Sequence, residues 1–80
     1  MEYKVLVIDV HELIEQDIED INIMNEDINK NGYNEKYDTE YPYMGKRLEQ
    51  KLNSLGEEGY DLYSCTQDSR NNYNVYILKR

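Results

Sequence analysis

The chain opens with a run of β-branched and aliphatic residues. Glu2–Val10 (EYKVLVIDV) holds no turn residue, which predicts a β-strand. A strand that is apolar on both faces is usually central in its sheet, so we expect other elements to cover each face. Both alternating sets are apolar at the centre of this strand: Tyr3, Val5 and Val7 on one side, and Leu6, Ile8 and Val10 on the other.

Two helical stripes follow the strand. Within Glu12–Asn29 the apolar residues recur at steps of four, three, three and four, and the opposite face is acidic or amide, which predicts an amphipathic helix. A second stripe predicts a helix that ends at Gly56 or Gly59, and the segment Asn31–Pro42 is predicted to be a loop. The first stripe is Ile14, Ile18, Ile21, Met24 and Ile28, and the second is Met44, Leu48, Leu52 and Leu55.

The last third of the chain predicts a β-hairpin. Tyr60–Thr66 and Tyr73–Leu78 have strand composition, and the polar stretch Gln67–Asn72 joins them. We therefore predict a single α+β domain over residues 1–80, with a three-stranded antiparallel sheet packed on the Met44–Leu55 helix and the first and last strands adjacent. The acidic helix, in an insertion at about 11–43, is expected to lie over the other sheet face or an edge.

Charge narrows the classes of partner. The chain has 17 acidic and 9 basic residues, and 11 acids against 2 bases fall between Asp9 and Glu40. This excess argues against duplex nucleic acid or an anionic membrane as a partner. We expect neither a membrane span nor a signal peptide, and the single Cys65 fits a reducing cytoplasm. The acidic helix is a solvated face, a surface for a basic protein, or a mimic of nucleic-acid phosphate.

The stretch Leu48–Leu62 (LEQKLNSLGEEGYDL), with the opening EYKVLVI and the closing NVYILKR, resembles a known family. These are the short bacterial and phage proteins of domain of unknown function 4177, whose Leu-rich helix ends L-x-x-x-G-W-E-L. Gly59 matches the family glycine, whereas Tyr60 replaces its Trp and Asp61 its Glu. The resemblance covers residues 1–10 and 44–80 and omits the acidic insertion. It implies a fold and a phage or mobile-element origin, and it implies no chemistry.

The supply of catalytic side chains is small. His11, Cys65 and three serines (Ser54, Ser64 and Ser69) are the candidate bases and nucleophiles, and no G-x-S-x-G motif is present. One His and one Cys do not make a zinc site. We therefore predict that the protein is not an enzyme and has no cofactor.

One segment resembles a calcium-binding loop. Residues 27–38 match D-x-N-x-N-G-x-x-E-x-x-D, with glycine at the sixth position. Against calcium, Asn34 occupies the eighth position, the twelfth is Asp and not Glu, and no second loop is present. We interpret the segment as a polar loop and keep the metal site as the weaker alternative. Its candidate ligands are Asp27, Asn29, Asn31, Glu35 and Asp38.

The best candidate binding site combines aromatic rings with positive charge at a helix N-terminus. Rings stack on planar ligands, and free N–H groups with Lys and Arg bind phosphate or carboxylate. The opposing interpretation is that these tyrosines line the rim of the core and the two cations are solvated. The candidate ligand-binding residues are Tyr37, Tyr41, Tyr43, Lys46 and Arg47.

Two functions remain open at this stage. The first is a non-catalytic, oligomeric protein that binds or sequesters a small phosphate-bearing ligand, such as a nucleotide signal of bacterial immunity. The second is an acidic protein–protein inhibitor or regulator, one form of which is a nucleic-acid mimic. Self-association is expected in either case, because a short chain does not cover both faces of its apolar first strand.

Overall fold

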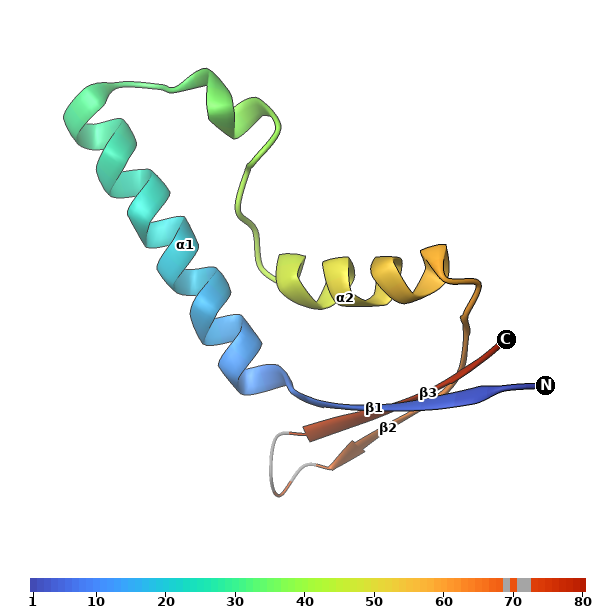
Figure 1. Ribbon diagram of the computed structural model, residues 1–80. Coiled ribbons are helices and arrows are strands. Elements are labelled where there is room, and N and C mark those ends of the chain that lie inside the picture. The colour runs from blue at the N-terminus through green and yellow to red at the C-terminus, as the bar shows by residue number, and fades with distance from the viewer. Residues whose placement is uncertain (69, 71–72) are drawn as a thin grey trace.

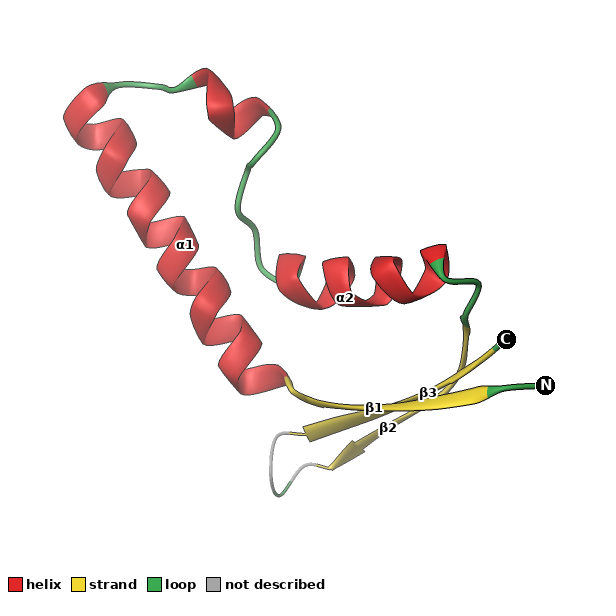
Figure 2. Cartoon of the chain, in the orientation of Figure 1, coloured by secondary structure: helices red, strands yellow, loops and turns green. Residues whose placement is uncertain are grey.

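The structure, a computed structural model, describes residues 1–68, 70 and 73–80. It is an α+β fold with one sheet and two α-helices, as predicted (Figures 1 and 2). Ser69, Asn71 and Asn72, which belong to the predicted turn, lie outside the described residues. The elements are β1 (Tyr3–Asp9), α1 (Val10–Asn31), the 3₁₀ helix η1 (Glu35–Asp38), α2 (Lys46–Glu57), β2 (Asp61–Asp68) and β3 (Tyr73–Lys79).

The sheet has the strand order β1-β3-β2, and both pairings are antiparallel. The prediction that the first and last strands are neighbours is confirmed. The expectation that β1 is central is wrong, because β3 occupies the centre and β1 is an edge strand. β3 pairs locally with β2 through the hairpin and with β1 on its other side, from Tyr3 opposite Lys79 to Asp9 opposite Tyr73.

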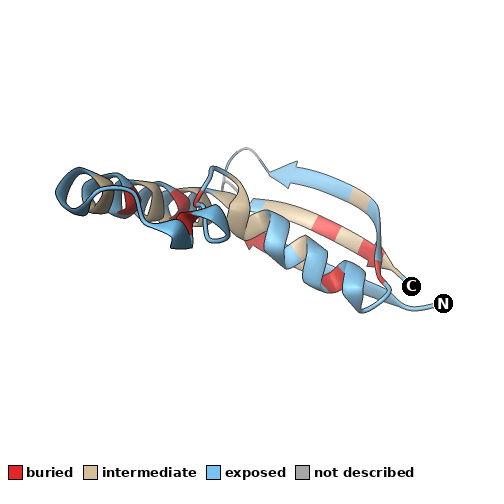
Figure 3. Ribbon diagram, turned by 90° about the horizontal axis from the view of Figure 1, so that it is seen from above, coloured by how far each residue is buried: buried red, intermediate tan, exposed pale blue. Residues whose placement is uncertain are grey.

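Helix α2 covers one face of the sheet, which we call the inner face. Its leucines meet the inward side chains of β1 and β3, while β2 remains exposed along almost its whole length (Figure 3). One short helix is too narrow to cover three strands, which explains why the core is small. The buried core is Ile8, Leu55, Tyr60, Tyr76 and Leu78, with Leu6, Val10, Leu13, Leu48 and Leu52 packed against it.

Helix α1 does not cover the sheet, which corrects the predicted placement. It begins at Val10, directly after β1 ends at Asp9, and the Asp9 side chain caps it by accepting the Glu12 N–H. With no loop between strand and helix, α1 continues outward from the sheet and meets α2 at an angle (Figure 1). The second sheet face, the outer face, is therefore left open among the described residues. Tyr3, Val5 and Val7 on this face are 52%, 62% and 59% exposed.

Candidate functional site

A buried carboxylate lies where α1 meets α2. Asp17 of α1 is 2% exposed and accepts the backbone N–H of Gly45 at 2.9 Å and that of Arg47 at 3.4 Å. Gly45 is the N-cap of α2, has a φ of 90° and offers no side-chain oxygen. The first N–H groups of a helix have no intrahelical partner, and a carboxylate at this end is favoured by the helix dipole. Asp17 thus occupies the N-terminus of α2, where the sequence predicted that a ligand phosphate would bind.

Arg47 is held by two carboxylates of the same chain. Its Nη2 donates to Asp20 Oδ2 at 2.8 Å, and its Nε lies 3.8 Å from Asp17 Oδ1. Asp17 and Asp20 are one turn apart on α1, so both reach one guanidinium. A ligand phosphate would have to compete with these partners for the positive charge of Arg47.

A groove of about 380 Å³ lies beside this ion pair. Tyr37, Lys46 and Arg47, three of the predicted ligand-binding residues, line it together with Lys36. The other lining residues are Asp20, Ile23, Glu40, Pro42 and Gln50.

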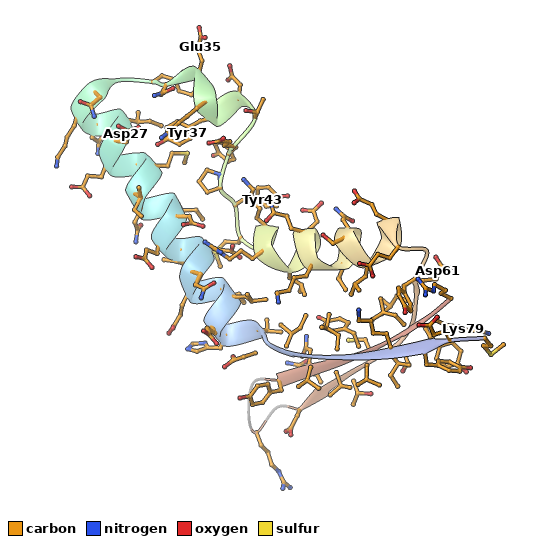
Figure 4. The ribbon with its side chains drawn as sticks, in the orientation of Figure 1. Asp27, Glu35, Tyr37, Tyr43, Asp61 and Lys79 are labelled. Atoms are coloured by element: carbon orange, nitrogen blue, oxygen red, sulfur yellow. The ribbon has the colours of Figure 1, made fainter. Side chains whose placement is uncertain are left out.

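The other two predicted residues lie outside the lining of this groove. The Tyr43 hydroxyl donates to Glu49 of α2, and this hydrogen bond raises the pKa of Tyr43. Tyr41 is 55% exposed, and its carbonyl oxygen accepts Lys46 Nζ at 2.9 Å. Figure 4 shows Tyr43 at the start of α2, away from Tyr37. The predicted aromatic cluster is therefore spread over two places.

Tyr37 is a structural anchor of the groove wall. It is 7% exposed, and its hydroxyl donates to Asp27 Oδ2 at 2.8 Å, which fastens η1 to α1 (Figure 4). This bond raises the pKa of Tyr37, whereas hydrogen bonds from Asn31 and Tyr37 lower the pKa of Asp27. Lys36 Nζ lies 5.1 Å from the centre of the Tyr37 ring. A ring buried to this extent offers little face for stacking on a ligand.

The calcium-like segment does not form a loop from its first position. Asp27, Asn29 and Asn31 belong to α1, and Asp27 Oδ1 accepts the Asn31 side chain at 2.8 Å. Glu35 and Asp38 belong to η1, and Asp38 accepts the Tyr33 hydroxyl. Within residues 1–68, 70 and 73–80, no group of three His, Cys, Asp or Glu side chains is placed to hold a metal ion.

The solvent side of α1 carries a line of glutamates. At 3.6 residues per turn, this line lies opposite Asp17, which faces α2. Glu15 pairs with His11 and Glu26 with Lys30, each at 3.0 Å and each between exposed side chains. Such exposed ion pairs contribute little to folding stability, and both join residues within α1. The line, which we call the acidic face, consists of Glu12, Glu15, Glu19 and Glu26.

Sequence reasoning missed Asp17 and Asp20, although a signal for Asp17 was present. Asp17 stands three residues after Ile14 and four before Ile21, which places it on the apolar stripe of the helix. An acidic residue on an apolar stripe predicts a buried carboxylate with a partner. The uncapped glycine that begins α2 was the complementary signal.

The chain matches no protein-family model, no curated protein and no solved structure at a significant level. The resemblance to domain of unknown function 4177 therefore stays a prediction. Within the described residues, neither α-helix is long and apolar enough to cross a membrane.

Proposed function

We propose that this is a non-catalytic binding protein that recognises a basic surface of a partner protein through the acidic face of α1. The observation that carries the proposal is the position of this face, on a 22-residue helix that extends away from the sheet and turns its glutamates to solvent (Figure 1). Exposed carboxylates on a regular helix steer a basic partner and orient it. The reducing cytoplasm is the compartment that we propose, since it suits the lone Cys65.

The contacts at the α1–α2 junction favour this function over phosphate binding. Asp17 satisfies the N–H groups at the start of α2, and Asp17 and Asp20 offset the charge of Arg47. By contrast, Glu12 and Glu19 have no side-chain partner within the described part of the chain. Binding through the acidic face would therefore break no contact that holds the fold together.

The partner can be sought directly in a lysate of the host. The tagged protein is immobilised and washed at 50 mM and at 500 mM NaCl, and retained proteins are identified by mass spectrometry. A triple variant, Glu12→Gln, Glu19→Gln and Glu26→Gln, removes three charges from the acidic face. We expect a basic protein that wild type retains at low salt, that the triple variant loses, and that high salt releases, because screening weakens exposed charge contacts.

The matched control neutralises three exposed glutamates elsewhere. Glu35→Gln, Glu57→Gln and Glu58→Gln change the net charge equally and leave the acidic face intact. The control should retain the partner as wild type does. A partner that binds the triple variant as tightly as the control would contradict the proposal.

The groove supports a second candidate function, sequestration of a small phosphate-bearing ligand. Lys36 of η1 and Lys46, the first residue of α2, bring positive charge to a groove of about 380 Å³. Calorimetry against a panel of nucleotides and cyclic nucleotides tests this function, with Lys46→Gln compared with the exposed Lys51→Gln. Binding that only Lys46→Gln weakens, and that persists at 500 mM NaCl, would favour this candidate over the acidic face.

A further inference from the structure

The outer face of the sheet has an apolar centre between two charged ends. The strand register arranges this face in four rows across the three strands. The two middle rows hold only aliphatic and small hydroxyl side chains, whereas the end rows carry charge (Figure 4 labels Asp61 and Lys79 at one end). In the order β1, β3 and β2, the rows are Tyr3, Lys79 and Asp61; Val5, Ile77 and Ser64; Val7, Val75 and Thr66; and Asp9, Tyr73 and Asp68.

Aromatic rings border this apolar centre. Tyr63, placed by the irregularity between Leu62 and Ser64, is 64% exposed, and its ring meets that of Tyr3 edge-on at 5.9 Å. Lys79 Nζ lies 5.8 Å from the centre of the Tyr63 ring. Tyr73, at the opposite end, is 42% exposed. An apolar centre with an aromatic and charged border is the composition of a protein–protein interface.

The molecule also has more surface than a chain of its size exposes alone. Its solvent-accessible area is 5966 Å², whereas about 5,100 Å² is usual for a folded monomer of 9.6 kDa. The radius of gyration is 15.8 Å where about 12 Å is usual, and one dimension of the Cα trace is only 10 Å. The excess, about 900 Å², is close to the roughly 800 Å² that each partner buries in a standard interface.

We infer that the outer face binds the outer face of a second copy of this chain, so that two sheets form a β-sandwich. The excess surface of the whole molecule is large enough for one such interface, and a face that covers itself needs no other protein to bury Val5 and Val7. Twofold dimers are the commonest homo-oligomers, and two sheets with apolar faces pack face to face in a sandwich. This inference is independent of the proposed function, because the acidic face of α1 takes no part in it.

Charge selects the orientation of the two sheets. An axis along the strands would place the row of Asp9 and Asp68 against its own copy and bring four carboxylates together. An axis across the strands places this row over the Lys79 row of the other copy, and the two middle rows then meet each other. The Lys79 row also holds Asp61 and has no net charge. The second arrangement is therefore favoured because it keeps the four carboxylates of Asp9 and Asp68 apart, since like charges facing each other are costly.

Light scattering of the full chain between 10 and 500 µM tests the inference. Wild type should give twice the mass of the 9.6 kDa chain at the upper concentrations. Val5→Glu should raise the dimer dissociation constant by roughly 100-fold or more, because it buries an unpaired charge in the interface. The matched control is Ile23→Glu, which adds the same charge at an apolar residue of α1 that is 56% exposed, and it should remain dimeric.

A second pair of variants guards against loss of folding. Thr66→Glu adds a charge to a middle row of the outer face and keeps every apolar side chain, whereas Gln67→Glu adds it to the other side of the same strand. Thr66→Glu should be monomeric with the far-ultraviolet circular dichroism of wild type, and Gln67→Glu should be dimeric. A monomeric wild type at 500 µM would overturn the inference. So would a dimer that survives Val5→Glu and Thr66→Glu, since it would indicate pairing through strand edges.

Discussion

The carboxylate of Asp17 accepts the backbone N–H of Gly45 across 28 residues of sequence, at 2.9 Å. One helix thereby caps another, because the N-cap residue of α2 is a glycine without a side chain. The same carboxylate lies beside Arg47, so a single buried group sets both the start of α2 and its angle to α1. The α1–α2 junction is therefore a structural contact that holds the two helices together.

Asp17→Ala should destabilise the protein by about 3 kcal/mol, because it leaves two backbone N–H groups without their acceptor and removes the carboxylate that lies 3.8 Å from Nε of Arg47. Urea denaturation followed by circular dichroism measures the loss. Glu19→Ala, on the solvent side of the same helix, is the control and should change stability by less than about 0.5 kcal/mol. Equal effects of the two substitutions would contradict the conclusion that Asp17 caps α2 and holds it against α1.

Glu2 should make stability depend on pH at the acidic end of the range. Its carboxylate accepts the Tyr60 hydroxyl and the Arg80 guanidinium, each at 2.8 Å, and these bonds lower its pKa below 4.5. A carboxylate whose pKa is lowered by folding stabilises the fold above the unfolded pKa and loses this effect as the pH falls through the folded value. The melting temperature of wild type should exceed that of Glu2→Gln at pH 7, and the difference should shrink below pH 4.5.

Tyr60→Phe tests the cause of the lowered Glu2 pKa. It keeps the aromatic ring and removes the hydroxyl whose hydrogen bond contributes most to that shift. Carbon-detected titration of the Glu2 carboxyl by NMR should show its pKa rising toward 4.5 in this variant. A difference between wild type and Glu2→Gln that stays constant from pH 7 to pH 3 would speak against a lowered pKa.

Removing the Tyr37 anchor should loosen the segment that it holds. Tyr37→Ala takes away both the buried ring and the hydroxyl that bonds Asp27, so amide exchange in residues 33–41 should accelerate by roughly tenfold or more. Tyr37→Phe keeps the ring and should accelerate exchange less. Tyr33→Phe, which removes a hydroxyl from an exposed ring, is the matched control. Unchanged exchange in Tyr37→Ala would mean that η1 is held by other contacts.

Calcium should not stabilise the protein. The Asp27 carboxylate is already bonded by Asn31 and Tyr37, and Glu35 and Asp38 lie on η1. No three acidic side chains of the described residues are placed to hold a metal ion. A melting temperature within about 1 °C of the metal-free value in 10 mM CaCl₂ is the expected result, since any ligand that binds only the native state must raise it. A clear rise that Asp27→Ala abolishes would establish the site after all.

Local pattern was sufficient for the elements of the fold. Leu48, Leu52 and Leu55 of the second stripe pack on the sheet as their spacing predicts, and the strand ends agree to within two residues. Met44, the first residue of that stripe, lies before α2 and is 53% exposed. The position of α1 could not be predicted from its apolar stripe. Such a stripe suggests that the helix packs on the sheet, whereas this one is only partly buried and its Ile18 is 43% exposed. What decides its direction is the lack of a linker after Asp9, together with a contact to Gly45 that is remote in sequence.

The candidate site was predicted only in part, again because some of its contacts join residues that are remote in sequence. Proximity along the chain placed Lys46 and Arg47 correctly beside one groove. Proximity also suggested that Tyr41 and Tyr43 would join them, but the Tyr43 hydroxyl is bonded to Glu49 and the Tyr41 side chain is 55% exposed. The partners of Arg47 come from another helix, and a helix period alone does not show which of its acidic residues turns inward.

The pairing of β1 with β3 sets the order in which the chain must fold. Each rung of this ladder joins residues roughly 60 or more positions apart, as Tyr3 with Lys79, whereas β2 and β3 meet across a short hairpin. Closing so large a loop costs entropy before any contact compensates for it, so local structure forms first. During synthesis the apolar β1 must wait until the last strand has left the ribosome, and until then Leu6 and Ile8, which the folded chain packs into its core, are open to aggregation or to a chaperone.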